Sequence, residues 1–367
     1  MDLLQTTEDL IRFRTETGNS AEIDKAAQYI KNKFSATNAK VEIFQSTASP
    51  VVFIRNTDSW DFDVIILGHI DVVPAADAMF EPFIKDGKMF GRGTLDMKSF
   101  AAVALNSMEY AVEHNLPLKF GVILSTDEEK GSKSTESFME AYPQINARIV
   151  LDNDVGGDIT KIVSKCKNPV FVKITARGKE AHGSTPWEGI DANEMIMRTW
   201  QNIRRIYPYY AADLPKPADT WFDTVHMAKI EGGQVSNIIS NYCEALLDFR
   251  LTENSSVENL EKNLQNCMEK GVEYKIVSSS TPVVMSETDP DISDYKRFAE
   301  NILGKTIEFE HIGGATDSRS FAVKGSTVIM HSGTGNGMHA AGEYVEIESV
   351  KQIADIQIKF LEHLAKK

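Results

Sequence analysis

Four short, continuous apolar runs constrain the fold of this chain more than any other feature. They are DFDVIILGH (61–69), KFGVILST (119–126), ARIVLDN (147–153) and STVIMHSG (326–333). Runs of this length and β-branched content are typical of strands that are buried on both faces of a sheet. Amphipathic helical patterns lie before, between and after them, at 20–34, 97–115 and 348–367. This alternation predicts an α/β fold, in which a mixed, at least partly parallel sheet carries helices on both faces.

The middle of the chain follows a different order of elements. Strand patterns at 169–177, 224–231, 242–252 and 272–278 alternate with helical patterns at 191–207 and 255–271. The order βαββαβ is that of the ferredoxin-like split fold. We therefore expect a first domain made from residues 1–167 and 282–367, interrupted by a ferredoxin-like α+β domain at 168–281.

Composition excludes several classes of function. With 367 residues the chain is too long for one ordinary core, and its 42% hydrophobic and 25% charged residues are typical of globular proteins. No apolar run approaches the roughly 20 residues that span a bilayer. The start, MDLLQTTEDLIRF, has an acid and a helix-like pattern instead of a signal peptide. We therefore expect no membrane partner.

Charge and cysteine usage add two further expectations. A net charge of −14 and a pI near 5.1 argue against a nucleic-acid partner, whose phosphates such a surface would repel. The three cysteines are far apart and form no CxxC pair. This usage favours a reducing cytoplasm, and it argues against a disulfide framework or a cysteine-based zinc site.

Acidic and histidine residues follow the buried strands directly or lie in loops between them. In chain order they are His69, Asp71, Asp96, Glu128, Glu129, Asp152 and His339. Asp96 also precedes the long helical pattern at 97–115, where the helix dipole favours an anion. Open α/β sheets bind their ligands at the carboxyl ends of the strands. Each residue alone is more simply a turn or cap residue, but together they predict one functional site.

The donor atoms of this set suit Zn²⁺, Co²⁺ or Mn²⁺. The candidate ligands are His69, Asp96, Glu129, Asp152 and His339. Five ligands are too many for one tetrahedral ion with an open position, but they suffice for two ions if one carboxylate bridges. Asp71 lies two residues after His69, on the same face of an extended segment, so it can accept from the far imidazole nitrogen.

The stretch STDEEKGS (125–132) places three acids side by side at a strand end. Like charges repel there unless something positive arrives. Adjacent residues in an extended segment point to opposite sides, so Glu128 and Glu129 should have different roles. We expect one to bind metal and the other to take a proton from water as general base.

At this point the chain resembles the dinuclear-zinc amidohydrolases and metallopeptidases that include succinyl-diaminopimelate desuccinylase, acetylornithine deacetylase, aminoacylase and glutamate carboxypeptidase. The matching motifs are GHIDVVP (68–74), FGRGTLDMK (90–98), STDEEKGS (125–132), RGKEAHGSTPWEG (177–189), GGATDSRSF (313–321) and GMHAAGEYV (337–345). They cover nearly the whole chain in the family's order. The resemblance implies a zinc-peptidase-like catalytic domain interrupted by a ferredoxin-like lid, through which we expect a homodimer.

The resemblance also implies roles for individual residues. Asp96 would bridge two divalent ions, and Glu128 would be the general base. His69 and Asp152 would complete one ion, and Glu129 and His339 the other. Asp154, in LDNDVGG, competes with Asp152, which we favour because it directly ends the strand.

Residues of the lid and of a late loop complete the implied site. His182 resembles the family histidine that reaches over a catalytic site, often the partner's, to stabilise the oxyanion. Asn237 and Arg250 resemble contacts to the substrate carboxylate and the oxyanion, and Arg319 resembles a carboxylate anchor. Arg319 lies in GGATDSRSF, which reads Ala-Thr-Asp-Ser where desuccinylases commonly read Thr-Ser-Asp-Gly. The simpler alternatives are that His182 is only an exposed histidine, that Asn237 forms a turn and that Arg250 is a surface charge at a strand edge.

These patterns predict a metal-dependent hydrolase that cleaves the amide bond of an N-acyl amino acid or short peptide. Our best expectation is the desuccinylase or acetylornithine deacetylase type. A dipeptidase or carboxypeptidase of the same family remains an alternative. A non-catalytic binding protein on this fold is another, although an intact general base argues against it. A dinuclear phosphohydrolase is a third, without an evident P-loop.

Overall fold

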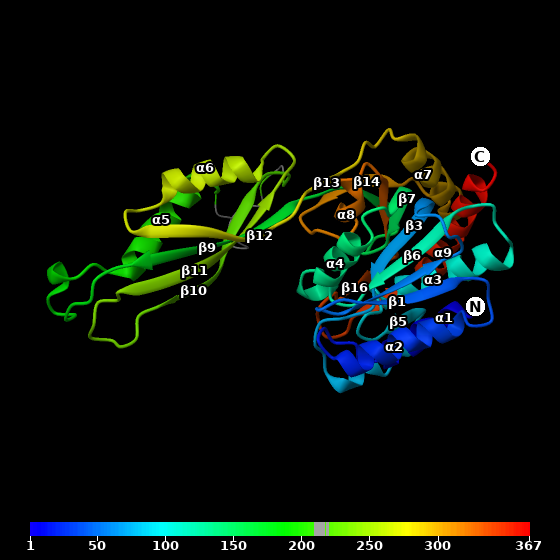
Figure 1. Ribbon diagram of the computed structural model, residues 1–367, viewed down its shortest axis with the longest axis horizontal. Coiled ribbons are helices and arrows are strands. Elements are labelled where there is room, and N and C mark those ends of the chain that lie inside the picture. Colours follow the sequence, from blue (N-terminus) through cyan, green and yellow to red (C-terminus); the bar gives the residue numbers. More distant parts are fainter. Residues whose placement is uncertain (209–216, 218–219) are drawn as a thin grey trace. The chain divides into compact units, whose positions relative to one another are not determined.

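The computed structural model describes residues 1–208, 217 and 220–367 (Figure 1). The chain divides into two compact units. The first comprises Met1–Lys165, Met285–Glu310 and Thr316–Lys367, and the second comprises Cys166–Val284 and His311–Ala315. The first unit is therefore assembled from segments on both sides of the second.

The first unit contains a large mixed sheet, as the apolar runs predict. Its strands are β1 (Lys40–Gln45), β2 (Pro50–Arg55), β3 (Asp61–His69), β6 (Phe120–Ser125), β7 (Asn146–Asp152), β15 (Thr327–His331) and β8 (Lys161–Cys166), joined by β14 (Glu308–Ile312) beside β8. The spatial order is β1-β2-β6-β3-β7-β15-β8. The four central strands, β6, β3, β7 and β15, are parallel, whereas β1, β2 and β8 pair antiparallel.

The register of the parallel strands brings their carboxyl ends to one edge. His69 of β3 pairs with Ser125 of β6, and Leu67 of β3 pairs with Asp152 of β7. Asp152 in turn pairs with Met330 of β15. Residues that directly follow these strands therefore lie along the same edge of the sheet, where open α/β folds place their sites.

Helices cover both faces of this sheet, which confirms the predicted fold class. They are α1 (Leu3–Arg12), α2 (Ser20–Lys33), α3 (Lys98–Glu113), α4 (Lys133–Ala141), α7 (Pro290–Leu303), α8 (Arg319–Ala322) and α9 (Ile347–Leu364). Val52 and Ile54 of β2 join the core formed with α3 and α9. Phe53, between them, contacts the ring of Phe138 in α4, with centroids 5.4 Å apart. Alternate residues of one strand thus anchor helices on opposite faces.

A second, small antiparallel sheet in the first unit is absent from the sequence-based expectations. Its strands are β4 (Phe83–Lys85), β5 (Lys88–Phe90), β16 (Gly335–Asn336) and β17 (Tyr344–Glu346), in the order β16-β17-β5-β4. Strands of two or three residues are too short to show a period of two. The pairing of Val345 with Met89 holds the loop after β5 beside the loop before β17.

The second unit has the predicted ferredoxin-like topology. It contains β9 (Asn168–Arg177), α5 (Ala192–Ile206), β10 (Thr224–Gly232), β11 (Tyr242–Leu251), α6 (Val257–Cys267) and β12 (Val272–Ser279). Its antiparallel sheet has the order β10-β11-β9-β12, and α5 and α6 pack together on one face (Figure 1). The short strand β13 (Val283–Val284) follows β12 in the sequence. Single 3₁₀ turns occur at Asp77–Phe80 and Glu128–Lys130 of the first unit and at Pro186–Glu188 of the second. Within the described residues, no helix combines the length and apolarity of a membrane span.

A buried histidine in the first unit predicts that the folded protein loses stability at acidic pH. His331 ends β15 fully buried; its Nε2–H donates to the Ile159 carbonyl at 2.7 Å, and its Nδ1 accepts from the Tyr295 hydroxyl at 3.2 Å. Burial lowers the pKa of His331 from 6.5 to about 4. The unfolded chain therefore binds the proton first, so stability present above pH 6.5 is lost as the pH falls towards 4.

We expect His331→Asn to reduce this loss. The free energy of unfolding, measured with urea on the metal-free proteins, should fall between pH 7.5 and 5.0 by about 2 kcal/mol more in the wild type than in the variant. Comparing the two pH dependences removes the contribution of all other groups. Equal pH dependence in both proteins would contradict a neutral, buried His331.

Candidate metal centre

The carboxylate of Asp96 lies between two histidines from distant parts of the chain. Its Oδ1 is 3.0 Å from Nε2 of His69, the last residue of β3. Its Oδ2 is 2.9 Å from Nε2 of His339, in the loop before β17. Asp96 itself precedes α3 and is 6% exposed. One buried carboxylate therefore joins residues that are 270 positions apart, His69 and His339.

Two further carboxylates complete two groups of potential ligands. Nε2 of His69 is 3.8 Å from Oδ1 of Asp154, and Nε2 of His339 is 3.0 Å from Oε2 of Glu129. In each group, His69–Asp96–Asp154 and Asp96–Glu129–His339, the ligand atoms lie within 4.8 Å of one another. The groups share Asp96, and a shared carboxylate can serve two ions of a dinuclear centre.

The structure brings Asp154, and not Asp152, to His69 and Asp96. We favoured Asp152 from the sequence because it ends a buried strand. Of the described residues, Asp152 belongs to neither ligand group. Its Oδ1 instead accepts a hydrogen bond from the backbone N–H of Asp154 at 2.8 Å. The chain thus continues two residues past β7 before a carboxylate reaches the group, and Asp152 supports that turn.

Asp71 connects His69 to the two neighbouring glutamates. Nδ1 of His69 is 3.0 Å from the backbone oxygen of Asp71 and 3.4 Å from its Oδ1. The carboxylate accepts the backbone N–H groups of Glu128 and Glu129, at 3.1 and 3.3 Å, and the hydroxyl of Thr17 at 2.7 Å. A partner at Nδ1 leaves Nε2 of His69 as the nitrogen that faces Asp96.

The crowding of acids shifts pKa values across the site. Burial raises the pKa of Glu128 well above its usual range, and burial also raises the pKa of Asp154 to about 7. Contacts with Asp96 and Glu129 raise the pKa of His339 to about 10. The acids and imidazoles of this site thus compete for the same protons. A divalent cation resolves this competition because it binds the deprotonated forms of both.

The residues present fit two divalent cations. Oε1 of Glu129 is buried and has no hydrogen-bond partner among the described residues, an expensive state unless a cation lies nearby. His339 has φ of 60°, an uncommon conformation for a residue other than glycine that is often found at functional sites. Nitrogen and carboxylate donors without thiolates match Zn²⁺, Co²⁺ and Mn²⁺.

Several buried acids support this centre without belonging to it. Asp127, the first of the three adjacent acids, accepts the N–H of Ser134 at 3.0 Å and so holds the start of α4. Two carboxylates that the sequence analysis missed are also buried. Asp317 accepts the hydroxyls of Ser125 and Thr135, at 3.3 and 2.7 Å, and Glu343 lies beside Asp96. Their positions inside the matching motifs GGATDSRSF and GMHAAGEYV were the available signal.

Within the second unit, the structure brings His182 and Asn237 to adjacent segments. The N–H of Gly183 donates to the carbonyl of Asn237 at 2.8 Å, and Nδ1 of His182 is 2.8 Å from the hydroxyl of Ser184. Arg250 lies elsewhere in the same unit and forms a two-point ion pair with Asp248, at 2.8 and 3.1 Å. The loop of Asn237 is therefore the part of this unit that gathers predicted site residues.

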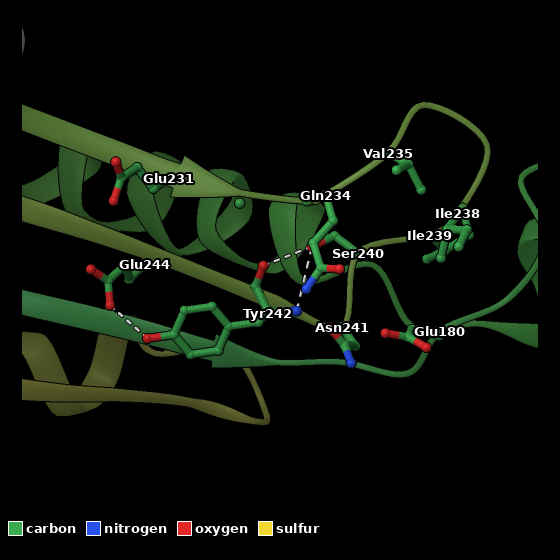
Figure 2. A pocket seen from close by; sticks show the side chains of 12 residues that line it. Glu180, Glu231, Gln234, Val235, Ile238, Ile239, Ser240, Asn241, Tyr242 and Glu244 are labelled. Carbon is green, nitrogen blue, oxygen red and sulfur yellow. Dashed lines mark hydrogen bonds between the residues drawn. The ribbon is translucent and has the colours of Figure 1, made fainter.

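A cavity of about 300 Å³ lies along this loop (Figure 2). Its lining includes Glu180, Gln234, Ile238 and Asn241, together with Tyr242, whose hydroxyl donates to Glu244 at 2.5 Å. None of the candidate metal ligands lines it. The cavity is thus a feature of the second unit alone, distinct from the metal groups of the first.

Comparison with known proteins identifies the family of this chain. Residues 65–363 match Peptidase family M20/M25/M40. The chain is 25% identical over 419 residues to an uncharacterized metallohydrolase of Methanocaldococcus jannaschii, covering 98% of this chain and all of that protein. It is also 25% identical over 350 residues to acetylornithine deacetylase of Shigella sonnei, covering 89% of this chain and 86% of that protein.

A solved structure shows the same fold over the full length. An M20 family metallo-carboxypeptidase of Sulfolobus solfataricus superposes with a TM-score of 0.83 at 17% identity, covering 100% of both chains. The family resemblance inferred from the six motifs is therefore confirmed. With its shared-carboxylate centre and its match over residues 65–363, this chain belongs to peptidase family M20/M25/M40 and is a metallohydrolase of amide bonds.

Proposed function

We propose that this protein hydrolyses the amide bond of an N-acyl amino acid or short peptide that carries a free carboxylate. The observation that carries the proposal is the Asp96 carboxylate shared between two ligand groups, with Glu128 in the adjoining turn. The 25% identity to an acetylornithine deacetylase supports a deacylase of the acetylornithine or succinyl-diaminopimelate type. A dipeptidase or carboxypeptidase of the same family is the second candidate.

In this proposal His69 and Asp154 would hold one ion, Glu129 and His339 would hold a second, and Asp96 would be a ligand of both. This assignment replaces Asp152 with Asp154 because only Asp154 approaches His69. When bound, the two ions supply Lewis-acid polarisation of the amide carbonyl and lower the pKa of the attacking water. Zn²⁺ suits the donors best, and Co²⁺ or Mn²⁺ would also fit.

Glu128 moves the proton in this proposal. Its backbone N–H is fixed by Asp71, and burial raises the pKa of its carboxyl, so the carboxylate is a stronger base than an exposed glutamate. It accepts the proton of the attacking water as the carbon–oxygen bond forms. It then passes that proton to the leaving nitrogen as the carbon–nitrogen bond breaks. Asp71 takes no proton; it holds His69 and the Glu128 backbone in position.

We assign substrate contacts to the remaining predicted residues. His182 and Asn237, on adjacent segments, would stabilise the oxyanion and bind the substrate. Arg319 is a better carboxylate anchor than Arg250, because its guanidinium is held less tightly. It donates to the Thr316 carbonyl at 3.1 Å and lies 3.9 Å from the Asp317 carboxylate. Arg250 would first have to leave its two-point ion pair with Asp248.

The setting of the enzyme forms part of the proposal. We propose a homodimer through the ferredoxin-like lid, supported by the exposed apolar residues Met197 of α5 and Ile230 of β10, which are 50% and 47% exposed. β10 ends the order β10-β11-β9-β12, so its outer edge can pair with another strand. Three free, buried cysteines support a cytoplasmic location.

The role of Glu128 predicts a variant that binds metal without turnover. Glu128→Gln should lower kcat about 10²–10⁴-fold while it retains both ions, because the amide keeps the shape and cannot take a proton. Amine release from N-succinyl-diaminopimelate, N-acetylornithine, other N-acyl amino acids and dipeptides would measure it. Wild-type rates in the variant would contradict the proposed base, and wild-type inactivity with two bound ions would contradict the substrate class.

The ligand assignment predicts different outcomes for two neighbouring aspartates. Asp154→Asn should weaken binding of one ion by at least about tenfold, because it removes a charged ligand. Asp152→Asn is the matched control and should retain two ions per chain, with a loss of stability only. Elemental analysis after dialysis against a weak chelator measures both. Ion loss in Asp152→Asn with retention in Asp154→Asn would restore the original assignment.

The anchor assignment predicts a substrate-dependent effect. Arg319→Leu should raise KM for carboxylate substrates about 10–100-fold, because a charge-assisted hydrogen bond is lost. Turnover of the corresponding primary amides should change little, so the preference for acid over amide should collapse. The same preference in the variant and the wild type would contradict this role. Arg250→Leu serves as the matched comparison.

A further inference from the structure

Glu343 is a fully buried carboxylate that gathers donors from a distant loop. Its Oε1 accepts the backbone N–H groups of Leu95 and Asp96, at 2.8 and 3.2 Å. Its Oε2 accepts the N–H of Gly93 at 3.1 Å and Nη1 of Arg92 at 2.5 Å. All four donors lie in the segment that ends with Asp96. The loop's own backbone hydrogen bonds include those from Thr94 to Gly91 at 3.3 Å and from Lys98 to Gly93 at 2.7 Å, and the Glu343 carboxylate binds the N–H groups of Gly93, Leu95 and Asp96.

The same residue belongs to the loop that carries His339. Its backbone oxygen accepts the N–H of Gly91 at 3.1 Å, and Nη2 of Arg92 donates to the carbonyl of Ala340 at 3.4 Å. Glu343 therefore ties the loop of Asp96 to the loop of His339 through both side chain and backbone. The ligand atoms that these loops carry, Oδ2 of Asp96 and Nε2 of His339, lie 2.9 Å apart.

The fit around Glu343 is tight on its own loop as well. Gly337 has φ of 82°, and a Cβ there would lie 3.0 Å from the Cα of Glu343. His339, between them, has φ of 60°. A loop with three residues in the left-handed region, Gly337, His339 and Gly342, persists when its surroundings fix it, and Glu343 supplies that fixed point.

Stability alone does not explain a buried ion pair at this place. Removing Arg92 and Glu343 from water costs free energy that their attraction repays only in part, and packed apolar residues often stabilise as well. Glu343 does what an apolar side chain cannot: its carboxylate accepts three backbone N–H groups of one loop and fixes their directions. Its contribution is therefore geometric.

We propose that Glu343, held by Arg92, is a positioning residue that sets Asp96 against His339 and thereby sets the affinity of the centre for its metal ions. The inference rests on the proposed dinuclear function. Glu343 itself touches neither substrate nor ion; it acts through the backbone of Asp96 and the conformation of the His339 loop. Partners of this kind typically change metal affinity about 10–100-fold.

The test compares Glu343→Gln with a matched control, Asp289→Asn. Asp289 accepts the backbone N–H groups of Asp291 and Ile292 at the start of α7, at 2.8 and 3.3 Å. It also accepts the hydroxyl of Thr327, at the amino end of β15 and thus at the opposite sheet edge. Both variants convert a carboxylate that binds backbone into an amide of the same shape. Affinity for Zn²⁺ is measured on the metal-free full chain by competition with a chromophoric chelator, and the Co²⁺ form is followed by visible absorption.

We expect Glu343→Gln to bind Zn²⁺ about 10–100-fold more weakly and to show an altered Co²⁺ spectrum, while Asp289→Asn matches the wild type in both. Wild-type affinity and spectrum in Glu343→Gln would overturn the inference. If Glu343→Gln does not fold, Arg92→Met is measured instead, with the same expectation and the same overturning result. A wild-type chain that binds fewer than two ions would overturn the proposed function and the inference together, whereas two ions with an unaffected Glu343→Gln would overturn the inference alone.

Discussion

The sharing of the Asp96 carboxylate between His69 and His339 is the contact on which the rest of this site depends. One oxygen faces each imidazole, at 3.0 and 2.9 Å, so a single side chain divides the acids around it into two groups. Asp96 can hold this place because the loop that leads to it from β5 is bound by the buried carboxylate of Glu343. The large sheet supplies His69 through the register of β3 with β6, and the small sheet supplies His339 through the pairing of β17 with β5.

Concentrated negative charge is costly, and the structure offsets that cost with backbone donors. Asp71 accepts two N–H groups from the turn that carries Glu128 and Glu129, and Asp152 accepts the N–H of Asp154. Glu343 accepts three from the Asp96 loop. In each case the supporting acid fixes the backbone of a functional acid. Asp71, Asp152 and Glu343 thus hold the functional acids in position, and backbone N–H groups, with Arg92 at Glu343, offset their negative charge.

Much of the fold could be predicted from the sequence because its buried strands are long and uniformly apolar. The run 61–69 became β3 without a shift, and the βαββαβ order at 169–278 gave the ferredoxin-like sheet. The small sheet could not be predicted, since strands as short as Gly335–Asn336 carry no periodic signal.

Among the site residues, strand ends identified His69 and Glu129, but Asp152 and Asp154 are both close to the end of β7. Only the path of the turn after the strand decides which carboxylate reaches His69. Glu343 was missed because an isolated glutamate beside a glycine looks like a solvated turn.

A crystal structure with Zn²⁺, measured with anomalous scattering at the zinc edge, would locate the metal ions of this centre. We expect two anomalous peaks per chain, one on each side of the Asp96 carboxylate. One peak should contact His69 and Asp154, and the other should contact Glu129 and His339. A single peak, or a peak bound by Asp152 in place of Asp154, would contradict the arrangement proposed for this centre.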